Sequence, residues 1–371
     1  MIAENAATRL RAGERDGERQ PGTMGALPTT QPVRRRGRLT HPDTSQMLGT
    51  RPADDLDGDA LTRWMTSAVP GFEGPLAYVR FAGGHRNQTY RIDTPHQAYV
   101  LRRRPSDPPR HAVHPIEREY RVLQALQRTG YPAARPLALC ADAAVIGEPF
   151  FLMALVEGRT LWDEAMPGMT PTHRRAHYDA WIHALAALHA IETAALALES
   201  AGFVPDRLDC KVGHWTHRES ARATPQLARL ADWLPTAVPQ ATIPALVHGD
   251  FRLQNLVFSQ EGVRVAAVID WDQASLGDPL IDLAYVLARW VSGTELHPGL
   301  DELAGPESGI PASEEMIARY REASGRDTGA ALDWHLAYTL FRLALIGQAE
   351  NPAHSATLAT TAWHHAERAG A

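Results

Sequence analysis

One segment in the C-terminal half of the 371-residue chain limits the possible folds more than any other feature. An apolar run, 245–247, leads into His248-Gly249-Asp250, and Asn255 follows the aspartate at the start of a second apolar run. A third apolar run, 265–269, ends at Asp270. Short apolar runs bounded by polar residues are typical of buried strands, so we expect these polar side chains at adjacent strand ends.

This set of side chains matches the requirements of phosphoryl transfer. A carboxylate such as Asp250 can orient an attacking hydroxyl and accept its proton, while an amide oxygen and a second carboxylate can hold Mg²⁺ against phosphate groups. We therefore predict Asp250 as the catalytic residue and Asn255 and Asp270 as magnesium ligands. Alone, His248-Gly249-Asp250 could be an ordinary turn, and Asp270 could be a cap at the end of a strand. Their order, with 20 residues between the two aspartates, favours the functional interpretation.

The pattern between residues 56 and 156 predicts a small antiparallel sheet with one helix packed on it. A short amphipathic helix ends near Pro70, and a second helix is expected over 116–127. Gly83-Gly84 separates the first two strand-like runs, as in a hairpin. The expected strands are 76–81, 87–92, 98–103, 137–140 and 150–156.

The remainder of the chain is predicted to be mainly helical, so the fold class is α+β. A strand-rich patch over 245–269 interrupts the helices. The expected helices are 172–191, 206–233, 279–291, 313–324 and 330–345.

These motifs resemble the aminoglycoside phosphotransferase and choline kinase family, whose fold is similar to that of protein kinases. The chain is most similar to the kinase-like domains found beside acyl-CoA dehydrogenases, over about residues 55–350. The resemblance is carried by residues 100–105, 118–123, 248–255 and 276–279. It implies a bilobal protein-kinase-like fold, with an N-lobe over 51–157, a helical C-lobe over 158–371, ATP as donor and a small-molecule hydroxyl as acceptor.

The resemblance also implies a nucleotide site in the N-lobe. Arg102 stands where the wider family has a lysine, and Glu119 stands where the family has the glutamate that pairs with it. All but one of the 37 basic residues are arginines, and the planar guanidinium could bind phosphate with altered geometry. Arg102 could instead be a surface arginine, and Glu119 could pair with a neighbouring arginine of its own helix. Gly83 and Gly84 are expected near phosphate, and Met153 and Leu155 near adenine, although these apolar side chains could equally be ordinary core.

The acceptor remains open at this stage. The close relatives imply a hydroxyacyl-CoA-type substrate, for which arginine and tryptophan side chains are suited. An aminoglycoside or other antibiotic would need an acidic pocket, for which Asp163, Glu164, Asp206 and Asp209 are candidates. A non-catalytic kinase-like nucleotide-binding protein is a third possibility, and the presence of Asp250, Asn255 and Asp270 argues against it. Asp282 is expected to brace the catalytic loop, through His248.

Composition limits the remaining possibilities. The net charge of −6 makes nucleic acid a poor partner, and no apolar run is long enough for a membrane helix, so we expect a cytoplasmic protein of unknown oligomeric state. The 17 histidines lack the spacing of a metal site, and His214, His217, His364 and His365 are expected at the surface.

Residues 1–50 read as a disordered tail. They contain eight arginines and five acidic residues but few large apolar residues, so they cannot repay the entropy cost of ordering. The tail is either a non-functional extension or translated upstream sequence, with a true start at Met24 or Met47.

Overall fold

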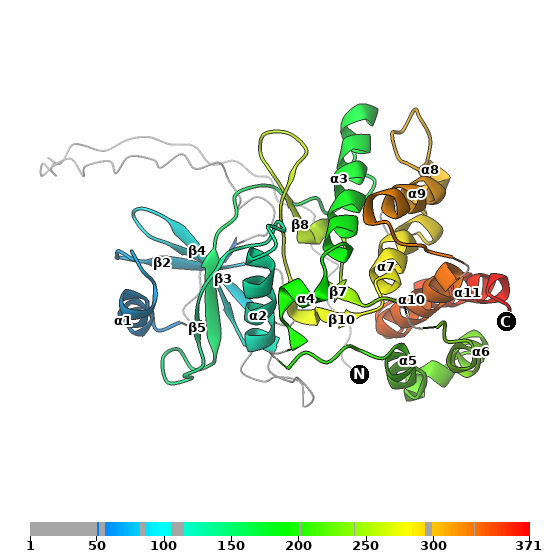
Figure 1. Cartoon of the computed structure of the whole chain (residues 1–371), viewed down its shortest axis with the longest axis horizontal. Helices are drawn as coiled ribbons and strands as arrows, with labels where there is room; N and C mark the ends of the chain where they lie inside the picture. Colours follow the sequence, from blue (N-terminus) through cyan, green and yellow to red (C-terminus); the bar gives the residue numbers. More distant parts are fainter. Residues whose placement is uncertain are drawn as a thin grey trace, which may run out of the picture. The chain divides into compact units, whose positions relative to one another are not determined.

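An antiparallel sheet forms the N-terminal lobe, as the alternating apolar runs predict (Figure 1). Its six strands follow the order β1-β2-β3-β4-β6-β5, and every neighbouring pair is antiparallel. The five predicted strands are present, and a two-residue strand, β1, is added at one edge. The strands are β1 (Thr50–Arg51), β2 (Ala77–Phe81), β3 (Gln88–Asp93), β4 (Ala98–Arg103), β5 (Pro136–Cys140) and β6 (Phe150–Ala154).

The computed structural model describes most of the chain from Thr50 onward. The predicted tail, apart from Thr50, lies outside the described residues, and so do Gly83 and Gly84. Residues 43–371 belong to a single compact unit, so both lobes can be discussed together. The described ranges are 50–51, 56–81, 87–104, 115–199, 202–240, 242–293, 299–329 and 331–371.

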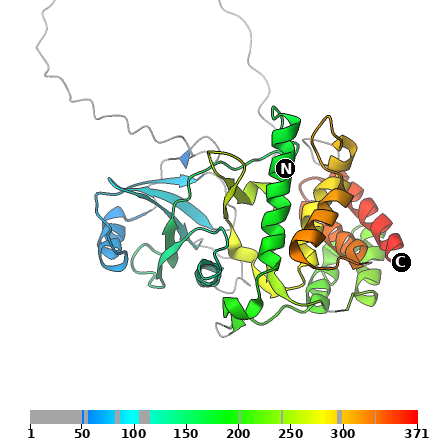
Figure 2. The same ribbon diagram turned by 45° about the horizontal axis from the view of Figure 1, so that its top comes forward.

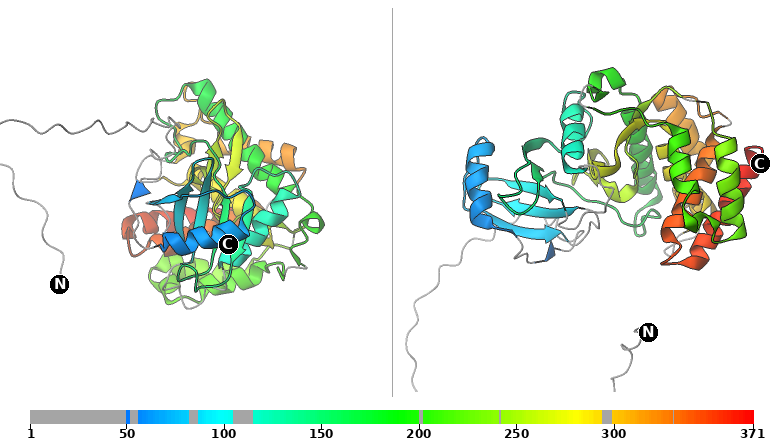
Figure 3. Two further views of the ribbon diagram at one scale, coloured as in Figure 1. Left: turned by 90° about the vertical axis from the view of Figure 1, so that its left-hand side faces the viewer. Right: turned by 90° about the horizontal axis from the view of Figure 1, so that it is seen from below.

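Two helices cover the two faces of the sheet. α1 (Gly58–Ala68) buries Leu61 and Met65 against one face, where they join a core with Tyr90 and Phe150. α2 (Pro115–Gln127) packs on the other face, between the sheet and the C-terminal lobe (Figures 1 and 3). The core under α2 continues into the C-terminal lobe, so one apolar cluster holds the two lobes together.

The C-terminal lobe is mainly helical, with two small antiparallel ribbons on the side that faces the sheet. β7 (Ala245–Val247) pairs with β10 (Ser275–Gly277), and β8 (Leu256–Phe258) pairs with β9 (Val265–Val268). The long helix α3 lies against these ribbons, and the later helices lie on the side of α3 that is away from the sheet (Figure 2). The helices are α3 (Pro171–His189), α4 (Thr193–Leu196), α5 (Leu208–Thr216), α6 (Pro225–Trp233), α7 (Leu280–Val291), α8 (Leu300–Leu303), α9 (Ser313–Ser324), α10 (Ala331–Gly347) and α11 (Pro352–Arg368).

One helical prediction is wrong, and one helix was not predicted. The segment 206–233 is not one helix, because α5 ends at Thr216 and a new helix, α6, begins at Pro225. Thr224 caps α6 by accepting a hydrogen bond from the amide of Leu227, and a proline is favoured at the first position of a helix. α11 was not predicted at all, although it packs its buried alanines and Leu358 against α10 and α6.

Candidate active site

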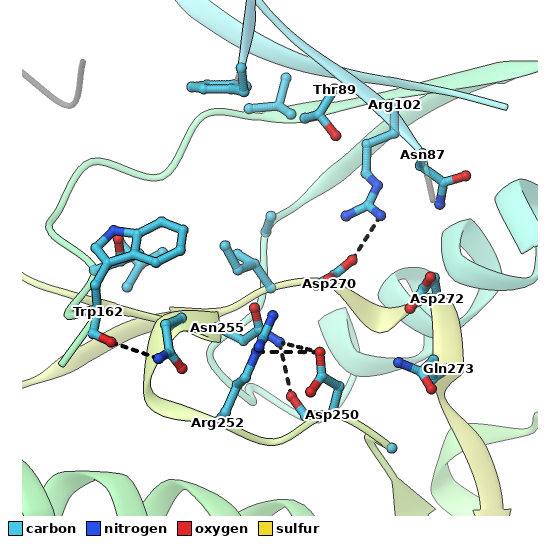
Figure 4. A pocket seen from close by; sticks show the side chains of 18 of the residues that line it. Asn87, Thr89, Arg102, Trp162, Asp250, Arg252, Asn255, Asp270, Asp272 and Gln273 are labelled. Carbon is cyan, nitrogen blue, oxygen red and sulfur yellow. Dashed lines mark hydrogen bonds and ion pairs between the residues drawn. The ribbon is translucent and has the colours of Figure 1, made fainter. Parts of the chain in front are cut away.

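The predicted site residues meet in a cleft of about 710 Å³ between the two lobes. The side chains that line it include those of Arg102 from β4 and of Asp250, Asn255 and Asp270 from the C-terminal ribbons. Glu119 lies behind Arg102, at 1% exposure. The strand ends therefore bring together the polar residues that the sequence analysis selected (Figure 4).

The turn at His248-Gly249-Asp250 requires its glycine. Gly249 has a φ of +86°, and an added Cβ would lie 2.8 Å from the carbonyl oxygen of Gln273. Any other residue would therefore combine a left-handed backbone with a steric clash. This turn places Asp250 directly after β7, with its side chain in the cleft.

Asp282 braces this turn from α7, as predicted, but not through the His248 imidazole. Its carboxylate accepts hydrogen bonds from the backbone amides of His248 and Gly249, at 2.6 and 2.8 Å, and lies 3.3 Å from Nε2 of His189. The imidazole of His248 lies instead between the amide of Asp250 and the carbonyl of Ile269. Burial alone would raise the pKa of Asp282, but its hydrogen bond from His189 and the nearby histidine charges hold the pKa below its ordinary value.

Asp250 is held by three neighbouring side chains. Nδ2 of Asn255 donates to the Asp250 backbone carbonyl at 2.9 Å and lies 3.3 Å from Oδ2. The hydroxyl of Tyr285 donates to Oδ1 at 2.5 Å, and Nε of Arg252 lies 3.5 Å from Oδ2. Since the Asn255 amide nitrogen is used in this way, its oxygen is the atom left for a metal ion.

Arg102 connects the two lobes through Asp270. Its Nη2 donates to Oδ1 of Asp270 at 2.8 Å (Figure 4). Its Nε lies 3.2 Å from Oε2 of Glu119. Burial disfavours the charged guanidinium, but the two carboxylates outweigh it and raise the pKa of Arg102. Asp270 has a left-handed backbone, with a φ of 69°, which is rare for a residue other than glycine and is a form of strain found at functional sites.

The two carboxyl groups beside Arg102 have pKa values that are shifted in opposite directions. Burial raises the pKa of Glu119 to about 8, although the charge of Arg102 opposes this shift. Burial would also raise the pKa of Asp270, but the charge of Arg102 and its hydrogen bond hold it below the ordinary value. Asp270 is therefore the stronger acid of the two.

The register of the sheet decides which arginine faces the cleft. Arg102 pairs with Thr89, and both side chains line the cleft. Arg103 points to the opposite face, where its guanidinium donates to Gln88 and to the hydroxyl of Tyr90. Arg102 is only 7% exposed, so it is not a surface arginine.

Asn87 is a further cleft residue that the sequence analysis did not select. It is 4% exposed, and neither its Nδ2 nor its Oδ1 has a hydrogen-bond partner among the residues that the structure describes. Side chains alternate along a strand, so Asn87 shares the cleft face with Thr89, close to Arg102 (Figure 4). A buried amide without partners is rare, and one that lines a cleft beside an arginine is suited to bind a ligand.

An apolar wall lies at the sheet end of the cleft. Met153 and Leu155 line it, together with Phe81, Val100, Ala134, Val257 and Ile269. The amide of Leu155 donates to the carbonyl of Ala98, so this N–H is already used within the protein. The wall could accept a flat apolar group, as the sequence analysis expected for adenine.

The other end of the cleft is rich in arginine. Arg289 from α7 and Arg342 from α10 line it. Nε of Arg289 lies 3.7 Å from Oε1 of Glu164, and the buried Nε of Arg342 has no hydrogen-bond partner among the described residues. Trp162, 47% exposed, and Ile346, 56% exposed, add apolar surface at this end. The acidic candidates Asp163, Glu164, Asp206 and Asp209 are not among the residues that line the cleft.

The histidines do not form a metal site in the described ranges, where no group of three or more histidine, cysteine or acidic residues could hold an ion. His214, His217 and His364 are exposed, as predicted. His365 is not at the surface: it is 4% exposed and its Nδ1 lies 2.7 Å from Asp333. The undetected helix α11 explains this error, because it turns His365 toward α10.

Comparison with known proteins identifies the family. The sequence model described as "Phosphotransferase enzyme family" matches residues 77–335, which include parts of both lobes and Arg102, Glu119, Asp250, Asn255 and Asp270. The chain belongs to the phosphotransferase enzyme family. None of the helices in the described ranges is long and apolar enough to cross a membrane.

Relatives within this phosphotransferase family agree with the resemblance seen in the sequence. The chain is 36% identical over 296 residues to acyl-CoA dehydrogenase family member 10 of Mus musculus, and 33% identical over 315 residues to acyl-CoA dehydrogenase family member 11 of Homo sapiens. These matches cover 78% and 82% of this chain but 28% and 40% of the relatives. The chain thus spans less than half the length of either relative.

Solved structures give the same result for the fold. A putative aminoglycoside phosphotransferase from Ralstonia eutropha JMP134 has a TM-score of 0.72 and 34% identity, over 85% of this chain and 97% of that one. A complex of aminoglycoside phosphotransferase APH(4)-Ia with AMP-PNP and hygromycin B has a TM-score of 0.56 at 16% identity, over 85% and 98% of the chains, and shows a likeness of fold alone. The predicted bilobal kinase-like fold is therefore confirmed, and a phosphotransferase that acts on a small molecule is the supported class of enzyme.

Proposed function

We propose that this phosphotransferase moves the terminal phosphoryl group of ATP, with Mg²⁺, to a hydroxyl of an anionic small molecule such as a hydroxyacyl-CoA. The observation that carries the proposal is the arrangement of Asp250, Asn255 and Asp270 beside Arg102 in one cleft. Asp250 would orient the attacking hydroxyl and accept its proton.

The protein atoms that line this part of the cleft are suited to bind ATP and Mg²⁺. The Asn255 amide oxygen and the Asp270 carboxylate are hard oxygen ligands, and two protein ligands suit Mg²⁺ because phosphates and water complete its shell. Arg102, backed by buried Glu119, and the unpartnered amide of Asn87 would hold phosphate oxygens. The bound metal would supply charge neutralisation at the phosphates. The wall with Met153 and Leu155 would accept adenine.

The arginines at the far end of the cleft favour an anionic acceptor over an aminoglycoside. Arg289 and Arg342 bring guanidinium groups to this end, and such groups are suited to carboxylate or phosphate oxygens. Arg289 is paired with buried Glu164, so Arg342 carries most of this argument. The guanidinium of Arg342 is also placed over the rings of Trp215 and Tyr338, which fixes its position. A polycationic antibiotic would meet the charge of Arg342 here, and the four acidic candidates do not line the cleft, although Glu350 does.

The experiment compares acceptors of opposite charge. ADP release from MgATP would be measured with a series of hydroxyacyl-CoA esters and, separately, with hygromycin B. We expect turnover with a hydroxyacyl-CoA, and we expect Arg342→Ala to raise the KM of that acceptor roughly tenfold or more without changing the KM of ATP. Faster turnover with hygromycin B would contradict the proposed acceptor class.

Arg229→Ala supplies the matched control for this experiment. The guanidinium of Arg229 also stacks on a tryptophan, Trp363, but it does not line the cleft. Its removal should leave both KM values unchanged. If Arg229→Ala and Arg342→Ala raised the acceptor KM equally, a general loss of stability would explain the effect and the anion-binding role would be wrong.

A further inference from the structure

Tyr285 contacts the carboxylate that the proposed function places at the centre of the chemistry. It lies on α7 one turn after Asp282, and residues three positions apart share one face of a helix. Asp282 accepts from the amides of His248 and Gly249, and the Tyr285 hydroxyl donates to Oδ1 of Asp250. One face of α7 thus holds three consecutive residues of the turn.

The hydroxyl of Tyr285 is a permanent donor in this contact. Burial, followed by the negative charge of Asp250, raises the pKa of Tyr285 to about 12, so the phenol keeps its proton at any physiological pH. The helix that carries it is firmly packed, with Ala284, Val286 and Leu287 all buried. The 2.5 Å O–O distance is that of a short O–H···O hydrogen bond.

This contact restricts the rotation of the Asp250 carboxylate. The terminal torsion of an aspartate has a broad energy well, so the carboxylate would otherwise turn easily. Its Oδ2 is approached by Asn255 and Arg252, and its Oδ1 by Tyr285. A carboxylate has about four lone-pair sites, two on each oxygen, so Oδ1, which among the described residues accepts only from Tyr285, keeps capacity for one more donor from the cleft.

We propose that Tyr285 is a positioning residue that fixes the Asp250 carboxylate so that a free lone pair of Oδ1 meets the hydroxyl to be phosphorylated. The proposal rests on the proposed function, in which Asp250 orients that hydroxyl. Tyr285 acts through Asp250 and does not itself exchange a proton.

The test uses Tyr285→Phe, which removes one oxygen atom, and water as the probe acceptor. Hydrolysis of MgATP to ADP and phosphate, with no other acceptor added, should show a kcat about tenfold lower in the variant. The KM of ATP should stay within about twofold, because Tyr285 would act on the nucleophile rather than on the nucleotide. Tyr90→Phe is the control: Tyr90 is a buried tyrosine of β3 that bonds to Arg103 and does not line the cleft, and its variant should keep the kcat of the wild type.

A second variant keeps the test decisive if Tyr285→Phe loses stability. Site-specific replacement of Tyr285 by 3,5-difluorotyrosine preserves the ring and the hydroxyl but makes the phenol ionise at a lower pH. Because the ionised phenol cannot donate, kcat should fall at a lower alkaline pH than in the unmodified protein. A merely structural role would leave this pH profile unchanged and would overturn the proposal.

The remaining outcomes distinguish an error in the role of Tyr285 from an error in the proposed function. An unchanged or increased kcat in Tyr285→Phe, with Asp250→Asn inactive, would overturn the role of Tyr285 alone; an increase would mean that its hydroxyl occupies the place of the acceptor. If Asp250→Asn hydrolysed ATP as fast as the wild type, the proposed function itself would be wrong.

Discussion

At the scale of single residues, the account depends on which side chains of β3 and β4 face the cleft. Arg102→Ala should raise the KM of ATP and lower kcat together, because Arg102 would bind phosphate and also holds Asp270. Arg102→Lys should be only partly active, since an ammonium group restores the charge but loses the planar fork. Steady-state kinetics with ATP as the varied substrate would measure both effects.

Arg103 and Arg104 are internal controls for this prediction. Arg103 is buried on the opposite face with Gln88 and Tyr90, and Arg104 pairs with Glu148 at the end of the strand. Arg103→Ala should lower the melting temperature, because buried hydrogen bonds are lost, yet change ATP kinetics much less than Arg102→Ala. A larger effect on the KM of ATP from Arg103→Ala would move the phosphate role to Arg103.

Asn87 provides a second test at this scale. Asn87→Asp keeps the shape but replaces a donor with a negative charge, so ATP should bind roughly 10–100-fold more weakly while adenosine binds as before. Gln88→Glu is the matched control, because Gln88 faces Arg103 on the other side of the sheet. Equal losses of ATP affinity in both variants, measured by calorimetry, would show that only net charge matters and that Asn87 makes no specific contact.

At the scale of elements, the sequence predicted the strands well and the connections between helices less well. The apolar runs of β4 and β6 are buried on both faces, so their pattern is strong. α11 was missed because its buried positions are mostly alanine, serine and histidine, which give little apolar contrast. Contacts such as Tyr285 with Asp250 join residues 35 positions apart, and only the packing of α7 against the turn reveals them.

The packing of α2 against β4 predicts a pH dependence. Since burial raises the pKa of Glu119 to about 8, the folded protein holds a proton there that the unfolded chain loses near the ordinary value. The stabilising effect of that proton is fully present below the unfolded pKa and is lost as pH rises through about 8. The melting temperature of the wild type should therefore fall between pH 5 and about 8.5 more than that of Glu119→Gln.

Comparing the wild type with Glu119→Gln cancels the contributions of the other titrating groups to the pH dependence of the melting temperature. Buried His189 and His365, whose pKa values are lowered chiefly by burial, act in the opposite direction but are present in both proteins. Identical slopes of melting temperature against pH would mean that Glu119 is ionised throughout, as in a simple ion pair with Arg102.

At the scale of the whole molecule, we predict that the N-terminal tail is dispensable for stability. A chain beginning at Thr50 keeps β1 and should melt within about 2 °C of the full-length protein, because residues 1–49 offer little apolar area to bury. Differential scanning calorimetry would measure both proteins. A drop of several degrees would show that the tail docks on the folded part.

The central claim is that both lobes combine to transfer phosphate, with Asp250 orienting the acceptor hydroxyl and Asp270 binding the metal ion. The most direct measurement pairs ADP release with MgATP binding in Asp250→Asn and Asp270→Ala. We predict that Asp250→Asn binds MgATP as the wild type does but turns over roughly 10²–10⁴-fold more slowly, and that Asp270→Ala loses the Mg²⁺-dependent part of nucleotide affinity. Near-normal turnover in Asp250→Asn, or the same Mg²⁺ dependence of binding in Asp270→Ala, would contradict the account.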